Sequence, residues 1–169
     1  MATGRRGSVV RALCEIVDTR PMSDRAIFPA HEAELGTLLA WIDRAACALG
    51  APREITVKLR IIAEELFTNT LNHGGNTHRP DATVTLALER AGTSLWLHYE
   101  DQGPAHDPFA PNARAALDRP VEERPVGGLG IVLIQGFAEA TRYRRAADRN
   151  CIEVALRIGP AANPDGSQR

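Results

Sequence analysis

The spacing of apolar residues changes from a helical period to strict alternation near residue 80, and this change constrains the fold most. From His31 to Gly50, and again from Pro52 to Gly74, apolar side chains recur every three or four residues, which predicts two amphipathic helices. Residues 84–88 and 95–99 then alternate between apolar and polar side chains, which predicts two strands joined across "ERAGTS". The chain therefore combines helices with hairpin-connected strands.

The remaining patterns extend this arrangement. "RAIFPA" is expected to be a strand that ends at Pro29, and "TRYRRA" and "CIEVALRI" are expected to form a second strand pair. Between the pairs lie an irregular segment, 102–126, and a short apolar helix, 130–139. We predict an α+β fold with helices on one face of the sheet. The expected domain covers 25–159, with an N-terminal extension over 1–24, helical or extended, and a disordered tail over 160–169.

Composition excludes several functional classes. The 169 residues suit one compact domain, and a net charge of −1 gives no indication of nucleic-acid or membrane binding. No apolar run approaches the roughly 20 residues of a membrane span, and no signal-peptide pattern is present. Cys14, Cys47 and Cys151 are odd in number and unpaired in spacing, so we expect three buried small hydrophobes in a cytoplasmic protein.

Three polar side chains share one face of the second predicted helix. Glu65, Asn69 and His73 stand at steps of four, so they stack a turn apart at the border of the apolar stripe. A pocket wall would lie at such a border. A solvated helix face would explain Glu65 and Asn69 equally well, and His73 alone would suit the helix C-terminal dipole.

Two further motifs contain glycines. In "EDQGPAHDP", Asp101 ends a strand and Gly103 permits a sharp turn, although an ordinary turn has the same residues. In "VGGLGIVLIQGF", Gly127, Gly128 and Gly130 precede an apolar helix, where backbone N–H groups can approach an anion. The glycines alone are a weak phosphate signal, since the lysine of a P-loop is missing.

The order of the three motifs resembles the GHKL nucleotide-binding superfamily over residues 26–158. "EELFTNTLNHG", "EDQGPAHDP" and "GGLGIVLI" are most similar to the small anti-sigma-factor serine kinases, the switch-protein kinases of bacteria. The resemblance implies a Bergerat-type ATP-binding fold, a two-layer sandwich with a mixed, mostly antiparallel sheet. It also implies ATP and Mg²⁺ as cofactors.

The resemblance assigns roles to individual residues. Asn69 would coordinate Mg²⁺, and Glu65 would be the catalytic base that accepts the proton of an attacking hydroxyl. Asp101 would accept a hydrogen bond from the adenine amino group, and Gly103 would let the base lie close to the backbone. His73 would contact the phosphates or only shape the helix end. The residues implied to meet the phosphates through the glycine-rich motif are Gly127, Gly128, Leu129, Gly130 and Ile131.

The implied function is that of an ATP-dependent protein serine/threonine kinase. Its substrate would be a STAS-type anti-sigma antagonist, and a sigma factor or another regulator would be held when the antagonist is absent. The family also suggests a homodimer. Two other classes remain open: a histidine-kinase-like ATP-binding domain, for which His31 would offer a phosphoacceptor rather than a helix start, and a non-catalytic ATP-dependent binding module.

One residue departs from the family pattern. His106 stands where phenylalanine is common, so an apolar plug is missing and the resting position of the following loop is in question. That loop is long and rich in proline and alanine, which suggests a lid. Arg114, Arg119 and Arg124 are candidates to meet the triphosphate, or they are simply solvated charges.

Overall fold

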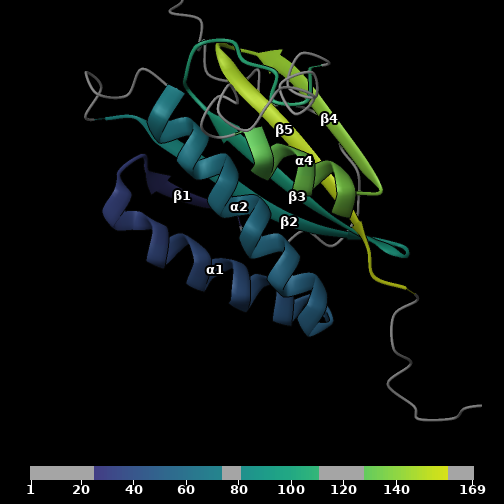
Figure 1. The fold of residues 1–169 in the computed structure, drawn as a ribbon. Coiled ribbons are helices and arrows are strands. Elements are labelled where there is room, and N and C mark those ends of the chain that lie inside the picture. The colour runs from purple at the N-terminus through teal and green to yellow at the C-terminus, as the bar shows by residue number, and fades with distance from the viewer. Residues whose placement is uncertain (1–24, 74–80, 111–127, 160–169) are drawn as a thin grey trace, which may run out of the picture.

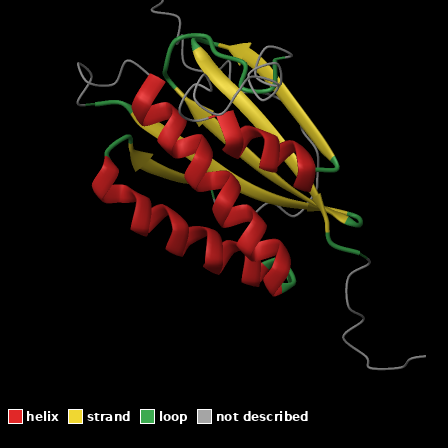
Figure 2. Ribbon diagram, viewed as in Figure 1, coloured by secondary structure: helices red, strands yellow, loops and turns green. Residues whose placement is uncertain are grey.

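Five antiparallel strands form a sheet in the described part of the chain. The computed structural model describes residues 25–73, 81–110 and 128–159. Within them the sheet has the order β1-β2-β3-β5-β4, and every pairing is antiparallel (Figure 2). The strands are β1 (Ala26–Pro29), β2 (Thr83–Ala91), β3 (Ser94–Asp101), β4 (Ala140–Ala146) and β5 (Arg149–Arg157).

Among the described residues, three α-helices lie on one side of this sheet, with α2 between α1 and α4 (Figure 1). They are α1 (Leu35–Ala48), α2 (Arg53–His73) and α4 (Gly128–Phe137), and the short 3₁₀ helix η1 (Glu32–Glu34) precedes α1. The predicted α+β sandwich with helices on one face is confirmed, and the strands predicted from alternation and from "RAIFPA" are all present.

The core lies between the helices and the sheet. On β3 the alternate residues Leu95, Leu97 and Tyr99 are buried, as the period of two requires. Burying one such side chain contributes about 1.5–3 kcal/mol, so the shared layer holds the helices on the sheet. The residues that meet them from α2 and β5 are Ile55, Leu59, Ile62, Leu66, Ile152, Val154 and Leu156.

Turns between the elements contain residues with positive φ. Gly50, with φ of +68°, ends α1 as predicted, because glycine accepts that conformation without strain. Between β4 and β5, Ala147 and Asp148 have φ of 47° and 60°, a pattern typical of tight two-residue hairpins. The resulting register places Asn150 opposite both Arg145 on β4 and Asp101 on β3.

His98 on β3 lies between two carboxylates. Its side chain is on the opposite face of the strand from the buried Leu97 and Tyr99. Its Nε2 is 3.2 Å from Glu89 Oε2 on β2, and its Nδ1 is 3.7 Å from Glu153 Oε1 on β5. Arg142 on β4 pairs with Glu153 and stacks on the Trp96 ring. Burial by itself lowers the pKa of His98, but the hydrogen bond and charge of Glu153 and the charge of Glu89 outweigh it and raise that pKa.

The structure corrects two details of the sequence analysis. Cys47 is exposed rather than buried, because it follows Ala46 on the face of α1 that turns away from the core, whereas Cys151 is buried as expected. Helix α4 begins at Gly128, two residues before the predicted start. The expectations for Cys14, the N-terminal extension, the Gly74-Gly75 helix end and the tail lie outside the described residues.

His31 is a helix-start residue. Its Nδ1 accepts a hydrogen bond of 3.2 Å from the backbone N–H of Ala33, and it caps η1. The helix-start interpretation of His31 is confirmed.

Candidate functional site

Glu65 and Asn69 form a connected pair on the border of α2. Both side chains are half-buried, and Asn69 Nδ2 donates a hydrogen bond of 3.1 Å to Glu65 Oε1. Burial raises the pKa of Glu65, the hydrogen bond from Asn69 opposes this, and the charge of Glu64 adds to it, so the net change is upward. A carboxylate whose pKa is raised in this way is a better proton acceptor than an ordinary surface glutamate.

The first turn of α4 packs directly on the Glu65 carboxylate. A Cβ atom built on Gly130 would lie 2.7 Å from Glu65 Cγ and closer still to Cδ and Oε2. Glycine is therefore required here for the observed position of the Glu65 side chain. The N-terminal turn of a helix also favours a negative charge through its dipole and its unpaired N–H groups. Ile131, next in the chain, is buried and anchors this turn in the core.

The chemistry of Asn69 fits a magnesium ligand. Because its amide nitrogen is engaged by Glu65, its carbonyl oxygen is the atom left to meet a cation, and Mg²⁺ prefers oxygen ligands. No group of three or more His, Cys, Asp or Glu side chains able to hold a metal occurs in the described part of the chain. A cation at Asn69 would therefore depend on phosphate oxygens and water for its other ligands.

Asp101 ends β3 as a buried carboxylate, 6% exposed. Its Oδ1 accepts hydrogen bonds from the backbone N–H of Gly103 at 2.7 Å and from Asn150 Nδ2 at 2.8 Å. Thr70 Oγ1 lies 3.4 Å from Oδ2, a long contact. The turn predicted at Gly103 is therefore held by the carboxylate itself, and Oδ2 keeps most of its acceptor capacity.

A pair of hydroxyl groups joins α2 to β3 beneath Asp101. The hydroxyl of Tyr99 lies 2.7 Å from Thr70 Oγ1 and donates to the backbone carbonyl of Leu66 at 3.3 Å. Burial raises the pKa of the Tyr99 hydroxyl well above its usual range, so the group stays neutral. These contacts fix the distance between the strand that carries Asp101 and the helix that carries Asn69.

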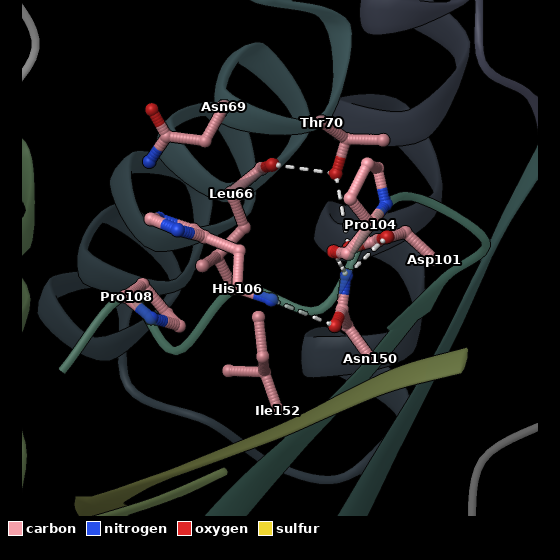
Figure 3. Close-up of a pocket in the computed structure, with 9 residues that line it drawn as sticks. All are labelled: Leu66, Asn69, Thr70, Asp101, Pro104, His106, Pro108, Asn150 and Ile152. Atoms are coloured by element: carbon pink, nitrogen blue, oxygen red, sulfur yellow. Dashed lines mark hydrogen bonds between the residues drawn. The ribbon is translucent and has the colours of Figure 1, made fainter. Parts of the chain in front are cut away.

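A pocket opens between α2, the end of β3 and the start of β5 (Figure 3). It encloses about 350 Å³, part of which is open solvent. Asn69 and Asp101 both line it, and apolar side chains form much of its wall. A planar base with an exocyclic amino group fits such a surface, since the flat faces need apolar contact and the edge needs an acceptor. The lining residues are Leu66, Asn69, Thr70, Asp101, Pro104, His106, Pro108, Asn150 and Ile152.

The segment after β3 takes a defined course along the pocket. The His106 side chain is exposed, and its backbone N–H donates to Asn150 Oδ1 at 3.2 Å. Pro108 is buried and Phe109 packs against the core, so apolar contact arises two and three residues after the position where phenylalanine was expected. The rest of the predicted lid, with Arg114, Arg119 and Arg124, lies outside the described residues.

The structure brings most of the predicted site residues into two groups. Glu65 and Gly130 are in contact, with Gly128, Leu129 and Ile131 in the same helical turn. Asn69 and Asp101 line one pocket, and Gly103 forms the turn beside it. Neither the His73 side chain nor Gly127 belongs to the described residues. The roles of all these residues stay predictions.

Asn150 is the residue that sequence reasoning missed. It is 3% exposed and contacts Asp101, Pro104, His106, Tyr143 and Arg145. One signal was available in the sequence: Asn150 is a polar residue in step with the buried Ile152, Val154 and Leu156. A polar side chain on the apolar face of a strand requires partners, because burying it without them is costly.

Residues 28–156 match the family described as "Histidine kinase-like ATPase domain". The chain belongs to this family. The α+β ATP-binding fold is the one that the resemblance of the three motifs implied. Membership of an ATPase-domain family implies ATP binding, and Mg²⁺ is commonly used with it.

Two solved structures are similar to this chain, and the first of them illustrates the fold. One contains the RsbU and RsbW domains of Rv1364c from Mycobacterium tuberculosis, with a TM-score of 0.55 and 14% identity. The match covers 83% of this chain but only 34% of that one, so this chain spans about a third of its relative's length. The other is the catalytic domain of the histidine kinase ThkA, with a TM-score of 0.46, 9% identity, and 82% and 99% of the two chains covered. No curated protein matches the chain.

Among the described residues, no helix is long and apolar enough to cross a membrane.

Proposed function

We propose that this protein is an ATP-dependent protein serine/threonine kinase of the partner-switching type. Its substrate is a STAS-type anti-sigma antagonist, and its second partner is a sigma factor or another regulator that it holds when the antagonist is absent. The single observation that supports this proposal best is the placement of Glu65, a carboxylate with a raised pKa, beside Asn69 and against the glycine-rich turn of α4.

Each residue has a defined task in the proposed reaction. Asp101 selects adenine through the amino group of the base, and Gly103 gives the base access to the backbone. Bound Mg²⁺ would neutralise phosphate charge, with Asn69 as its protein ligand. The backbone N–H groups of the α4 turn meet the phosphates. Glu65 accepts the proton of the attacking serine hydroxyl, so the oxygen becomes a better nucleophile as it approaches the γ-phosphorus. As the new bond forms, the bond from the γ-phosphorus to the bridging oxygen breaks and ADP leaves.

The proposal can be separated from its alternatives by where the phosphate goes. Purified protein is incubated with labelled ATP, Mg²⁺ and a STAS-type antagonist from the same genome. Phosphate on a serine or threonine of the antagonist is the expected result. Phosphate on a histidine would instead indicate a histidine kinase; the structure gives His31 a capping role that such an acceptor does not need. ATP-dependent capture of a partner without transfer would indicate a binding module.

The magnesium assignment has its own test. Asn69→Ala should abolish the Mg²⁺-dependent part of ATP binding while the fold remains, because removing a half-buried amide at the edge of a helix rarely costs much stability. Calorimetric titrations with and without Mg²⁺ measure the difference. Exposed Asn72→Ala is the matched control. Wild-type affinity for MgATP in Asn69→Ala would exclude Asn69 as the ligand.

We also propose that the protein is a homodimer and is located in the cytoplasm. The family resemblance supports a homodimer, which analytical ultracentrifugation tests directly. It also supports a cytoplasmic location, where a sigma factor would be encountered; fractionation of the native cell tests this.

A further inference from the structure

Both ends of the Asn150 side-chain amide are engaged. Its carbonyl oxygen, Oδ1, accepts hydrogen bonds from three donors contributed by β4 and by the segment after β3. These donors are the His106 backbone N–H at 3.2 Å, the Tyr143 hydroxyl at 3.0 Å and Arg145 Nη1 at 2.9 Å.

The three donors determine which way the amide points. Only the oxygen of an amide accepts, and only its nitrogen donates, so a flipped amide would lose the contacts to the His106 N–H and to Arg145, which can only donate. The nitrogen must then face the opposite side, where two acceptors lie. Asn150 Nδ2 donates to Asp101 Oδ1 at 2.8 Å and to the backbone carbonyl of Pro104 at 2.9 Å.

This orientation controls the carboxylate of Asp101. Its Oδ1 receives two short hydrogen bonds, from Asn150 and from the Gly103 backbone, whereas Oδ2 has the long contact to Thr70. The two oxygens of Asp101 are therefore not equivalent, and Oδ2 is the one with capacity for a new donor. Figure 3 shows Asn150 and Asp101 meeting at the wall of the pocket.

The same residue also holds the first turn after β3. Asn150 contacts both Pro104 and His106, and Arg145 Nη1 donates to the Gly103 carbonyl at 2.7 Å. The β4–β5 hairpin thus holds residues 103–106, of which Pro104 and His106 line the same pocket as Asp101.

We propose that Asn150, oriented by Tyr143 and Arg145, is a positioning residue that presents Asp101 Oδ2 to the amino group of adenine. It thereby sets the preference of the site for adenine over guanine, which carries a carbonyl oxygen at the corresponding position. This proposal rests on the proposed function only in taking ATP as the ligand; it needs no phosphoryl transfer.

The decisive variant is Asn150→Asp, which keeps the shape and all acceptor positions. At pH 7.5 the introduced carboxylate cannot donate to Asp101 and repels it. A hydrogen bond to a charged group is worth about 1.5–3 kcal/mol, so MgATP should bind about ten- to a hundredfold more weakly, with a smaller change for MgGTP. Calorimetric titration of both nucleotides measures the ratio of the two affinities.

The pH dependence tests whether a donor between residue 150 and Asp101 is what the site requires. Two adjacent carboxyl groups share a proton more readily than one group alone binds it, so lowering the pH to 5.5 restores a donor between them. The affinity of Asn150→Asp for MgATP, relative to wild type at the same pH, should therefore recover on acidification. A loss that does not change with pH would overturn the proposal, because a donor to Asp101 would then have been restored without effect.

If Asn150→Asp does not fold, two substitutions on β4 test the positioning role of Asn150 instead. Arg145→Met and Tyr143→Phe each remove one donor to Asn150, and Arg145→Met also removes the contact to the Gly103 carbonyl. Each variant should reduce the ATP-to-GTP affinity ratio by about threefold or more. Arg144→Met is the matched control, because Arg144 points to the opposite face of β4. An unchanged ratio in both β4 variants would overturn the proposal.

Failure of this inference is distinguishable from failure of the proposed function. If the wild-type protein binds MgATP in preference to MgGTP but Asn150→Asp, Arg145→Met and Tyr143→Phe do likewise, the inference alone is wrong. If the wild-type protein binds neither nucleotide, the kinase proposal fails with it.

Discussion

Gly130 and Glu65 are so closely packed that no other residue fits at position 130 unless the Glu65 side chain moves. The atoms that would collide with a Cβ atom are the far end of the glutamate, which can rotate away without disturbing the helices. The position of the candidate base is therefore set by the absence of a side chain on a different helix.

Replacing Gly130 with alanine should misplace Glu65 while the fold is retained. Alanine favours a helix by up to about 1 kcal/mol over glycine, so the melting temperature should not fall greatly. Phosphoryl transfer at saturating MgATP should nevertheless slow at least about tenfold, because the base no longer lies where the hydroxyl approaches. Single-turnover kinetics with labelled ATP measure the rate.

Gly136 supplies the control for this prediction. It lies in the same helix, and nothing lies within 4 Å of a Cβ atom there, so Gly136→Ala should transfer phosphate at the wild-type rate. Adding Gly130→Ala to Glu65→Gln should cause little further loss if Gly130 acts through Glu65. Weaker MgATP binding with an unchanged transfer rate would instead assign Gly130 to the phosphates.

Glu65→Gln should separate transfer from binding. The amide keeps the shape but cannot accept a proton, and general-base assistance contributes about 10²–10⁴ in rate. MgATP should bind nearly as well as in wild type, whereas phosphorylation of the serine-bearing partner should slow at least about a hundredfold. Exposed Glu64 points about 100° away on α2, so Glu64→Gln is the control. Normal transfer by Glu65→Gln would exclude Glu65 as the catalytic base.

Asp101→Asn should weaken adenine nucleotides selectively. The charged acceptor for the amino group is lost, which corresponds to about a ten- to hundredfold loss in affinity. Competition between ATP and GTP, measured by displacement of a fluorescent nucleotide, gives the ratio directly. Equal weakening of both nucleotides would contradict the adenine assignment.

The carboxylates around His98 should make stability depend on pH. Because the pKa of His98 is raised in the folded protein, its contribution is fully present below the unfolded value of 6.5 and is lost as the pH rises through the folded value. The free energy of unfolding, relative to His98→Gln, should therefore decrease above about pH 6.5. A partly exposed pair of this kind contributes about 1 kcal/mol or less. Urea unfolding from pH 5.5 to 8.5 measures it.

His31 provides the comparison for this titration, since its imidazole caps η1 at the surface. His31→Gln should not remove the decrease seen in wild type above pH 6.5. A parallel pH profile for wild type and His98→Gln would show that Glu89 and Glu153 do not stabilise the charged imidazole.

Local pattern was sufficient for most of the fold but not for the site. Alternation predicted β3 because buried Leu95, Leu97 and Tyr99 repeat every two residues. The start of α4 was placed too late because glycine has a poor helix propensity, and the reason for Gly130 is a contact with Glu65, 65 residues earlier in the chain. Asn150 was missed for a similar reason: two of its partners, Asp101 and Pro104, are 49 and 46 residues away.

The hydroxyl contacts between Tyr99, Thr70 and Leu66 have a consequence for the energetics of binding. They join the base-recognition strand to the helix of Asn69 before any ligand arrives, so this half of the pocket is preorganised. Little conformational entropy remains to be lost there when adenine enters. We therefore expect adenine and adenosine alone to bind measurably, with the phosphates adding affinity at the α4 end, rather than all recognition depending on the triphosphate.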